Sequence, residues 1–339
     1  MSLKPKIEFF TIQLKHKNDK VKTFKDFVID ELKGKEIDTN DVLYKKLFTH
    51  FMKALGSDVA KYDKLRKEIK LVNNKKNRFL DFKPSYKSEK NYISGVINGG
   101  FFGKDGILTG KETEHSINKD MSVLYYYYIF MYLPLDYKEG FIIVHSNSKE
   151  ENITNIYKHF SERLFRGENY KISKANYFTP KVFQKEFLNH SYLSHLTFSQ
   201  SMVDNYDSKK CVTTNVDKYN VRLIITPNTD EKIKLTDLKN LKNYFGKLIF
   251  GRTDKEIELS NFDRSSVTLK NSEDKSEKTF SWNVEKEDFV PVVYLKDRIK
   301  KFNADGTPNF KELDEYCIKL FENKVLKEFR PDLNVSKIK

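Results

Sequence analysis

Residues 123–144, VLYYYYIFMYLPLDYKEGFIIV, decide the fold of this chain. Residues 123–133 form an almost unbroken apolar and aromatic run, residues 134–140 are a polar segment that holds a proline and a glycine, and residues 141–144 are apolar again. An apolar run that ends in turn residues is typical of a buried strand. The stretch therefore predicts two neighbouring strands of one sheet joined by a turn.

The four consecutive tyrosines at residues 125–128 allow two interpretations. In a strand the side chains alternate between the two faces, so the even-numbered and odd-numbered residues of this run point in opposite directions. Both sets are apolar, which favours a central strand with two buried faces. Exposed tyrosines would instead form a stacking platform for single-stranded nucleic acid. We expect core packing, because no RNP-like motif accompanies the run.

The rest of the chain mixes helical and strand patterns. Apolar residues recur at helical spacing over residues 24–32 and 42–55, and Asn309 is placed to cap a helix that starts at residue 310. Residues 256–295 hold four short apolar segments with turn residues between them, as in an antiparallel meander. The sequence therefore predicts the α+β class, with a mostly helical, basic N-terminal region followed by a mixed or antiparallel-sheet body with flanking helices.

Shifts in composition suggest three domains. Residues 1–90 form the basic, mainly helical N-terminal region, residues 91–205 an α+β sheet domain, and residues 206–339 a β-meander with a C-terminal helix. A chain of this length is expected to form more than one domain. Ser148 and Glu151 make a capping box that predicts a helix within the second domain.

Positive charge is concentrated near the N-terminus. The 339 residues hold 62 Lys and Arg against 48 Asp and Glu, a net charge of +14, and residues 1–90 contribute +10 of that excess. Residues 61–90 alone carry 11 basic and 4 acidic side chains. This density favours a polyanionic partner, and nucleic acid is the polyanion that we expect.

These charges are predicted to lie on a helix. Ser57 or Asp58 can cap it, and apolar residues recur near helical spacing from Val59 to Val72. Lysines three residues apart would form a basic stripe that follows the phosphates of a nucleic acid, although a solvated helix face has the same pattern. The predicted nucleic-acid contacts are Lys61, Lys64, Arg66, Lys67, Lys70, Lys75, Lys76 and Arg78.

A second set of candidate residues lies in a polar segment between two apolar runs. Carboxylates with a histidine suit Mg²⁺ or Mn²⁺, so this segment could hold the metal of a nuclease. No spacing in the sequence fixes their geometry, and we expect no cofactor unless the protein is a nuclease, in which case we expect Mg²⁺. The candidate catalytic residues are Glu112, Glu114, His115 and Asp120.

Several glycines follow a predicted strand at residues 92–97. Gly99, Gly100 and Gly103 come before Lys104, but the spacing does not match the phosphate-binding loop of nucleotide hydrolases. We expect a flexible loop here. The alternative is a loop whose glycines permit a ligand to approach the backbone closely.

Composition also restricts where the protein works. Cys211 and Cys317 fit neither a disulfide framework nor a zinc site, so we expect two free thiols in a reducing cytoplasm. No apolar run approaches the ~18 residues that span a bilayer, so we expect no membrane partner. The use of 53 Lys but only 9 Arg indicates an AT-rich bacterial genome.

Together these observations predict a cytoplasmic bacterial protein that binds DNA or RNA through its basic N-terminal region. A role in a mobile-element or antiviral phage-defence system fits this pattern. Two alternatives stay open: a divalent-metal-dependent nuclease, and a non-enzymatic interaction subunit whose basic face binds an acidic protein partner.

Overall fold

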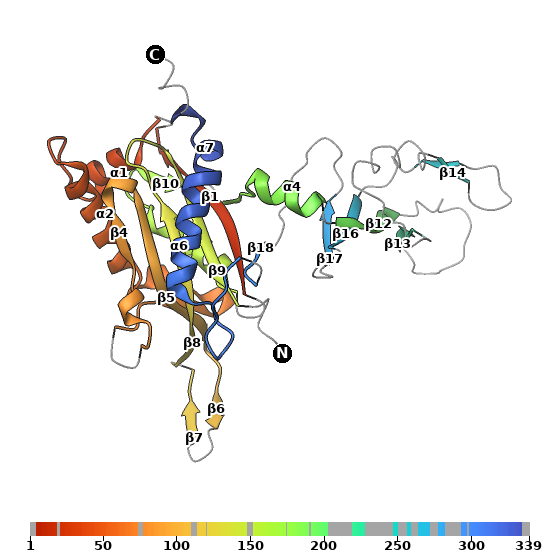
Figure 1. Ribbon diagram of the computed structural model, residues 1–339, viewed down its shortest axis with the longest axis horizontal. Coiled ribbons are helices and arrows are strands. Elements are labelled where there is room, and N and C mark those ends of the chain that lie inside the picture. Colours follow the sequence, from red (N-terminus) through yellow and green to blue (C-terminus); the bar gives the residue numbers. More distant parts are fainter. Residues whose placement is uncertain are drawn as a thin grey trace, which may run out of the picture. The chain divides into compact units, whose positions relative to one another are not determined.

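The computed structural model divides the chain into two units, which Figure 1 draws as ribbons. Unit 1 comprises Met1–Pro180 and Val292–Lys339, and unit 2 comprises Lys181–Pro291. No helix within the described residues is long and apolar enough to cross a bilayer. The structure describes residues 5–18, 21–73, 77–109, 114–119, 121–147, 152–173, 175–189, 191–202, 219–227, 247–249, 256–258, 264–271, 277–281, 293–296 and 298–333.

Unit 1 is built on one antiparallel sheet. Its strands lie in the order β10 (Tyr170–Ile172), β1 (Lys6–His16), β9 (Glu139–Ser146), β8 (Ser122–Tyr132), β5 (Tyr92–Phe102), β3 (Lys67–Lys70) and β2 (Lys61–Tyr62). Three short strands pair at its margins: β11 (Asn176–Tyr177) and β18 (Val293–Tyr294) with β1, and β4 (Ser85–Lys87) with β5. The antiparallel pairing of β8 with β9 confirms the two neighbouring strands predicted for residues 123–144.

One face of the sheet is covered by α1 (Phe24–Glu31), α2 (Asn40–Ala54) and α3 (Thr154–Leu164). A capping box starts α1, because the Thr23 side chain accepts from the backbone of Asp26 while the Asp26 carboxylate accepts from the backbone of Thr23. Side chains such as Ile129 and Val144 point from the sheet into the core beneath these helices. Each large apolar side chain buried there contributes about 1.5–3 kcal/mol.

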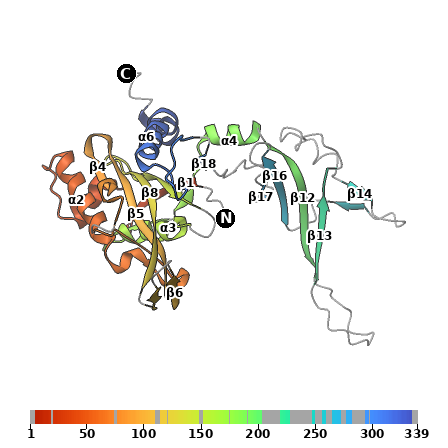
Figure 2. The ribbon, with the colours of Figure 1, turned by 60° about the horizontal axis from the view of Figure 1, so that its bottom comes forward.

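The opposite face is covered by the C-terminal helices α6 (Phe310–Leu320) and α7 (Leu326–Phe329), with the π-helical segment η6 (Phe321–Val325) between them. The ring of Phe321 lies 5.2 Å from that of Phe130 and 5.3 Å from that of Phe141, centroid to centroid. The predicted cap at Asn309 is confirmed, since its side chain accepts from the backbone of Glu312. Figure 2 shows α3 and α6 on opposite sides of β5 and β8.

The tyrosine run therefore lies between two layers of helices. Tyr127 and Tyr128 point to opposite faces and are each 1% exposed. Core packing accounts for most of the run, as predicted. Tyr125, near the beginning of β8, is the exception, because it is 38% exposed. The α+β class is thus observed, with helices packed on both faces of a large antiparallel sheet.

The predicted basic helix over residues 57–72 is wrong, and with it the mostly helical N-terminal region. The 3-10 turns η1 (Asp58–Ala60) and η2 (Asp63–Leu65) alternate there with β2 and β3. Arg66 has a left-handed backbone with φ of 49°, which ends the second turn. Pairing of β3 with β5 satisfies backbone groups and buries Ile69, and these gains outweigh the helical preference of the local sequence.

Two of the glycines expected in a flexible loop, Gly99 and Gly100, lie within β5 instead, whereas Gly103 follows the strand. A Cβ atom added to Gly100 would lie 1.7 Å from the carbonyl oxygen of Val123. A Cβ atom added to Gly99 would lie 3.0 Å from Cγ2 of Ile153. Both glycines therefore allow the chain to pack against itself.

The hairpin of β6 (Gly106–Thr109) and β7 (Glu114–Ile117) extends beyond the ends of β5 and β8 (Figure 1). It connects the two longest paired strands of the sheet, so the hairpin lies at the end that carries Phe102 and Ser122.

Unit 2 contains a separate antiparallel sheet. Its strands lie in the order β13 (Tyr219–Ile225), β12 (Ser191–Met202), β16 (Arg264–Asn271) and β17 (Glu277–Ser281), with α4 (Lys181–Asn189) before them and a second pair, β14 (Lys247–Ile249) and β15 (Glu256–Glu258). Two neighbours of the predicted meander, β16 and β17, pair as expected. The last segment of the meander, β18, pairs instead with β1 of unit 1.

The close approach at Gly100 gives a stability prediction. We expect Gly100→Ala to destabilise unit 1 by about 3 kcal/mol, because the added methyl group forces β5 and β8 apart. Gly106→Ala is the matched control, since a methyl group added there would have nothing within 4 Å of it. Urea unfolding of both variants measures the difference, and equal midpoints would contradict the packing role of Gly100.

A buried histidine predicts acid sensitivity. His145 in β9 is fully buried with its ring 5.9 Å from that of Phe310, and burial lowers its pKa to about 3. The unfolded chain binds a proton at this residue near pH 6.5, so it holds more protons than the folded chain and stability falls as pH drops below about 6.5. We expect His145→Leu to weaken this pH dependence in unfolding measurements between pH 7 and 4.5. His115→Leu, at an exposed position, should keep the wild-type dependence.

Candidate nucleic-acid interface

One edge of the sheet gathers basic side chains from three segments. Arg66 and Phe102 are joined by a backbone hydrogen bond from Phe102 N to Arg66 O at 3.0 Å, and Gly103 N donates to Lys119 O at 3.1 Å. The Arg66 guanidinium also donates to the carbonyl oxygen of Gly103 at 3.3 Å. We define the basic edge as Lys61, Lys64, Arg66, Lys67, Lys104 and Lys119.

The basic edge has an excess of positive charge. Five of its six side chains are exposed, and Lys67 is half-buried. In the part of the chain that the structure describes, no carboxylate forms an ion pair with any of the six. Three exposed acids, Asp58, Asp63 and Asp105, lie in the same segments and leave an excess of three positive charges. A fourth acid, Glu68, lies opposite Lys61 but is neutralised by its ion pair with Lys70. The edge therefore has positive charge to offer an anionic partner.

Lys67 is the most constrained member of the basic edge. Its Nζ atom donates to the carbonyl oxygen of Asn152 at 2.6 Å and lies 4.6 Å from the ring centroid of Phe101. Burial lowers its pKa below the usual value for lysine. Lys67 thus has a fixed position over an aromatic ring, unlike the exposed lysines beside it.

The helix α3 contributes two further groups to this edge. Arg163 donates to the carbonyl oxygens of Asp58 at 2.7 Å and Lys61 at 3.3 Å, which fixes the strand β2. The His159 ring stacks on Tyr62 with 4.1 Å between centroids and an interplanar angle of 14°. Burial, and then the charge of Arg163, lower the pKa of His159.

Two of the remaining predicted contact residues, Lys70 and Arg78, form ion pairs with acidic side chains. Lys70 lies 2.6 Å from the Glu68 carboxylate, and Arg78 forms an ion pair with Asp305. Burial alone would raise the pKa of Glu68, but hydrogen bonds from Lys70 and Ser122 lower it. Both cations therefore have an acidic partner already. Lys75 and Lys76 lie outside the described residues.

The structure brings together little of the predicted metal cluster. Glu114 and His115 are consecutive residues of β7, so their side chains point to opposite faces of an exposed hairpin. Glu112 and Asp120 lie outside the described residues. Within the described ranges, no group of three or more His, Cys, Asp or Glu side chains could hold a metal ion.

A polar network fixes the start of α3 next to the basic edge. Asn152 Nδ2 donates to Glu8 Oε2 at 3.0 Å, and Thr154 Oγ1 donates to the same oxygen at 2.5 Å. Lys6 lies 3.3 Å from the other Glu8 oxygen, and Asn152 accepts from the backbone of Thr154. Each charged group of the network is thus satisfied, and its carboxylate lies favourably at a helix N-terminus. The network holds α3 on the sheet and places the carbonyl group that Lys67 binds.

A small cavity of about 250 Å³ lies at the opposite end of β5. The rings of Tyr92, Phe130, Tyr132 and Phe321 line it, and an ion pair between Lys90 and Glu322 at 2.7 Å lies at its rim. Apolar rings and an ion pair whose two partners already bind each other do not indicate which ligand the cavity would bind or which reaction it would catalyse.

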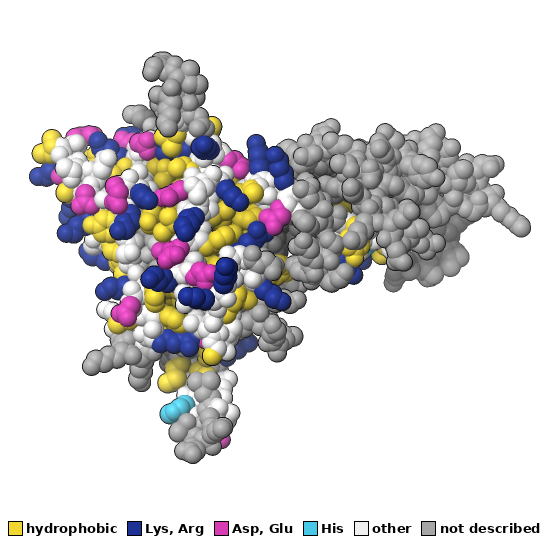
Figure 3. Space-filling view, in the orientation of Figure 1, with side chains coloured by type: hydrophobic (Ala, Val, Ile, Leu, Met, Phe, Trp, Pro, Cys, Tyr) yellow, Lys and Arg dark blue, Asp and Glu magenta, His cyan; other side chains and the backbone are white. Residues whose placement is uncertain are grey.

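Figure 3 shows the face that carries α6, where Lys and Arg side chains alternate with Asp and Glu. Such mixed charge is typical of an ordinary soluble surface. The basic edge, with its excess of positive charge, is therefore a better candidate for binding an anionic partner than the face that carries α6.

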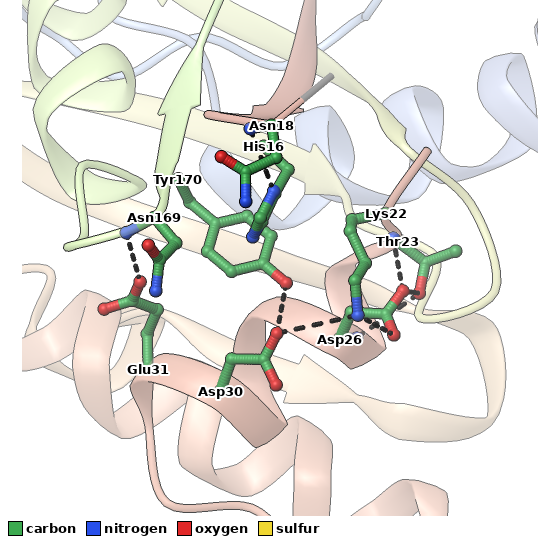
Figure 4. Close-up of polar contacts among 9 residues, drawn as sticks. All are labelled: His16, Asn18, Lys22, Thr23, Asp26, Asp30, Glu31, Asn169 and Tyr170. Carbon is green, nitrogen blue, oxygen red and sulfur yellow. Dashed lines mark hydrogen bonds and ion pairs between the residues drawn. The ribbon is translucent and has the colours of Figure 1, made fainter. Parts of the chain in front are cut away.

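A second polar cluster joins α1 to β10 (Figure 4). Tyr170 donates to the Asp30 carboxylate at 2.5 Å, and Lys22 lies 3.7 Å from Asp30 and 3.3 Å from Asp26. Glu31 accepts from two backbone N–H groups of the loop before β10. Burial, and then the bond to Asp30, raise the pKa of Tyr170, so its phenol stays protonated and donates. The partners within the cluster are matched, which indicates a structural clamp.

This clamp gives a testable distinction between structure and function. We expect Tyr170→Phe to lower the free energy of unfolding by roughly 1 kcal/mol, the typical net value of one hydrogen bond, and to leave ligand binding unchanged. Chemical unfolding measures the first quantity. A loss of binding at unchanged stability would instead place this cluster in the functional site.

Sequence reasoning missed several residues of the interface. Lys104 and Lys119 come from loops that are distant from residues 61–67 in the sequence, and only the pairing of β3 with β5 brings them together. Phe101 lies directly beside the glycines that were expected in a loop. No local pattern of residues signals these neighbours.

Comparison of the chain with protein-family models, with curated proteins and with solved structures gives no match. No activity, substrate or partner is therefore transferred from another protein, and function has to follow from the side chains described above.

Proposed function

We propose that this protein binds nucleic acid, and that the basic edge contacts the phosphates. The observation that carries the proposal is the convergence of six basic side chains from three segments, none of which forms an ion pair with a carboxylate among the described residues. Each lysine or arginine that neutralises a phosphate releases counterions from the nucleic acid, which favours binding at low and moderate salt.

The arrangement of the basic edge favours contact with a backbone rather than with specific bases. Lys61 and Lys64 are exposed on a short strand and a 3-10 turn, and Lys104 is exposed in a loop. Flexible lysines act as point charges and carry no bidentate geometry for a base edge. We therefore expect high affinity at low salt, a steep salt dependence and little sequence preference.

The sequence left two alternative functions open, a metal-dependent nuclease and a subunit that binds an acidic protein. The experiment described next also tests these alternatives. A place in a bacterial mobile-element or phage-defence system stays a prediction from composition.

The test is a salt titration with labelled DNA and RNA. We expect the variant K61E/K64E/K104E to reduce the slope of log affinity against log salt by about 3, since each lost phosphate contact removes about 0.9. The control K311E/K319E/K327E makes the same change in net charge on exposed residues of α6 and α7, and we expect it to keep most of the slope. Mg²⁺ in the buffer makes cleavage visible in the same samples.

Three results would overturn the proposal or redirect it. Equal losses in the two variants would mean that net charge alone attracts the nucleic acid. Absence of binding by the wild type at about 100 mM salt, where a surface with several phosphate contacts should still bind, would exclude the proposed function. Mg²⁺-dependent products would indicate a nuclease.

A further inference from the structure

The basic edge carries a row of aromatic and cationic side chains on a single face of the sheet. Tyr62 of β2 lies opposite Lys67 of β3, and Lys67 lies opposite Phe101 of β5. Residues that are directly opposite in paired strands project to the same side. This is the side that carries α3, as the stack of Tyr62 on His159 confirms.

A third aromatic residue lies diagonally beside this row. Tyr125 of β8 is opposite Gly99 of β5, two residues from Phe101, and therefore projects to the same side. We define the aromatic row as Tyr62, Phe101 and Tyr125. Tyr62 and Phe101 are two strand spacings apart, which is about 10 Å.

Two rings of the aromatic row are exposed, unlike the rings farther along β8. Phe101 is 37% exposed and Tyr125 is 38% exposed, whereas Tyr127, Tyr128 and Phe130 are at most 1% exposed. Core packing explains the buried rings, but it gives no reason for large rings in water at the ends of β5 and β8. Phe101 lies beside Lys67 of the basic edge, and Tyr125 is the diagonal neighbour of Phe101 on the same face.

Neighbouring side chains hold two of the three rings of the aromatic row in place. Lys67 lies over the ring of Phe101 and is anchored by the carbonyl group of Asn152. The neutral ring of His159 supports Tyr62 from the helix side. Rings that are already ordered lose little conformational entropy when a flat ligand stacks on them.

We infer that the ligand of this surface is single-stranded nucleic acid, whose unpaired bases stack on Phe101 and Tyr125 while the basic edge binds its phosphates. This inference rests on the proposed function and adds strandedness to it. Alternating aromatic and basic side chains are the means by which proteins bind single strands without sequence preference. A duplex offers the same phosphates, but its bases are already stacked on one another and cannot reach the rings.

DNA and RNA single strands share this chemistry, so the experiment uses both. The probes are a 20-nucleotide oligo(dT), a 20-nucleotide oligo(U) and a duplex of the same length, each labelled at one end. Binding is measured by fluorescence anisotropy at several salt concentrations. Tighter binding of one single strand identifies the natural class of ligand.

The decisive variant is F101L/Y125L, which removes the rings and keeps an apolar side chain. We expect it to weaken single-strand binding by about 10- to 100-fold, the range that corresponds to loss of base stacking, and to leave the salt slope unchanged. The matched control F82L/F302L changes two other exposed rings, each 38% exposed, and should bind like the wild type. Thermal unfolding of all variants checks that each is folded.

The outcomes separate this inference from the function on which it rests. If K61E/K64E/K104E loses salt slope while F101L/Y125L binds single strands like the wild type, the basic edge binds nucleic acid but the stacking role is wrong. If the duplex binds as tightly as the single strands, the inferred preference for single-stranded nucleic acid is wrong as well. If the wild type binds neither form, the proposed function fails and this inference fails with it.

Discussion

The pairing of β5 with β8 is the constraint on which the rest of unit 1 depends. The two strands are in register over eleven residues, and β8 directs large rings to both faces of the sheet. Apolar surface left in water would cost about 25 cal/mol per Å², so each face requires a layer of helices. Gly99 and Gly100 belong to the same constraint, because side chains there would meet Ile153 and the backbone of Val123.

The candidate interface follows from where this covering ends. Ile153, next to the first turn of α3, packs over Gly99, while β5 continues to Phe102 and β8 begins at Ser122. The strands thus extend past the helix that covers them and expose two rings. The short strands β2 and β3 pair at the same end and bring basic side chains with them. The same two strands, β5 and β8, therefore bury core side chains where helices cover them and expose side chains of the candidate interface where the helices end.

Sequence patterns predicted those parts of the fold in which local signals and tertiary packing agree. The strands around residues 123–144 and the cap at Asn309 are examples, since apolar runs and capping side chains act over short distances. The helix predicted for residues 57–72 was wrong because the apolar spacing there suits a helix in isolation, whereas the pairing of β3 with β5 decides the structure. Charge alone predicted Lys61, Lys64, Arg66 and Lys67 as contacts. Tyr125 was expected to pack in the core with the rest of the tyrosine run, and no role was predicted for Phe101. Periodicity shows which face a ring occupies and cannot show where a helix stops covering that face.

The inference of single-strand binding rests on the position and exposure of the rings rather than on composition. The composition predicts an AT-rich genome, which would supply many Tyr and Phe residues, so their number alone carries no functional signal. Most of the rings are used in the core, and the two that stay exposed at the ends of β5 and β8 adjoin the basic edge. An acidic protein could neutralise the lysines, but it would need apolar groups placed to cover both rings. An unpaired nucleic-acid strand carries phosphates and flat bases along one chain, and therefore satisfies both features of the surface through a single ligand.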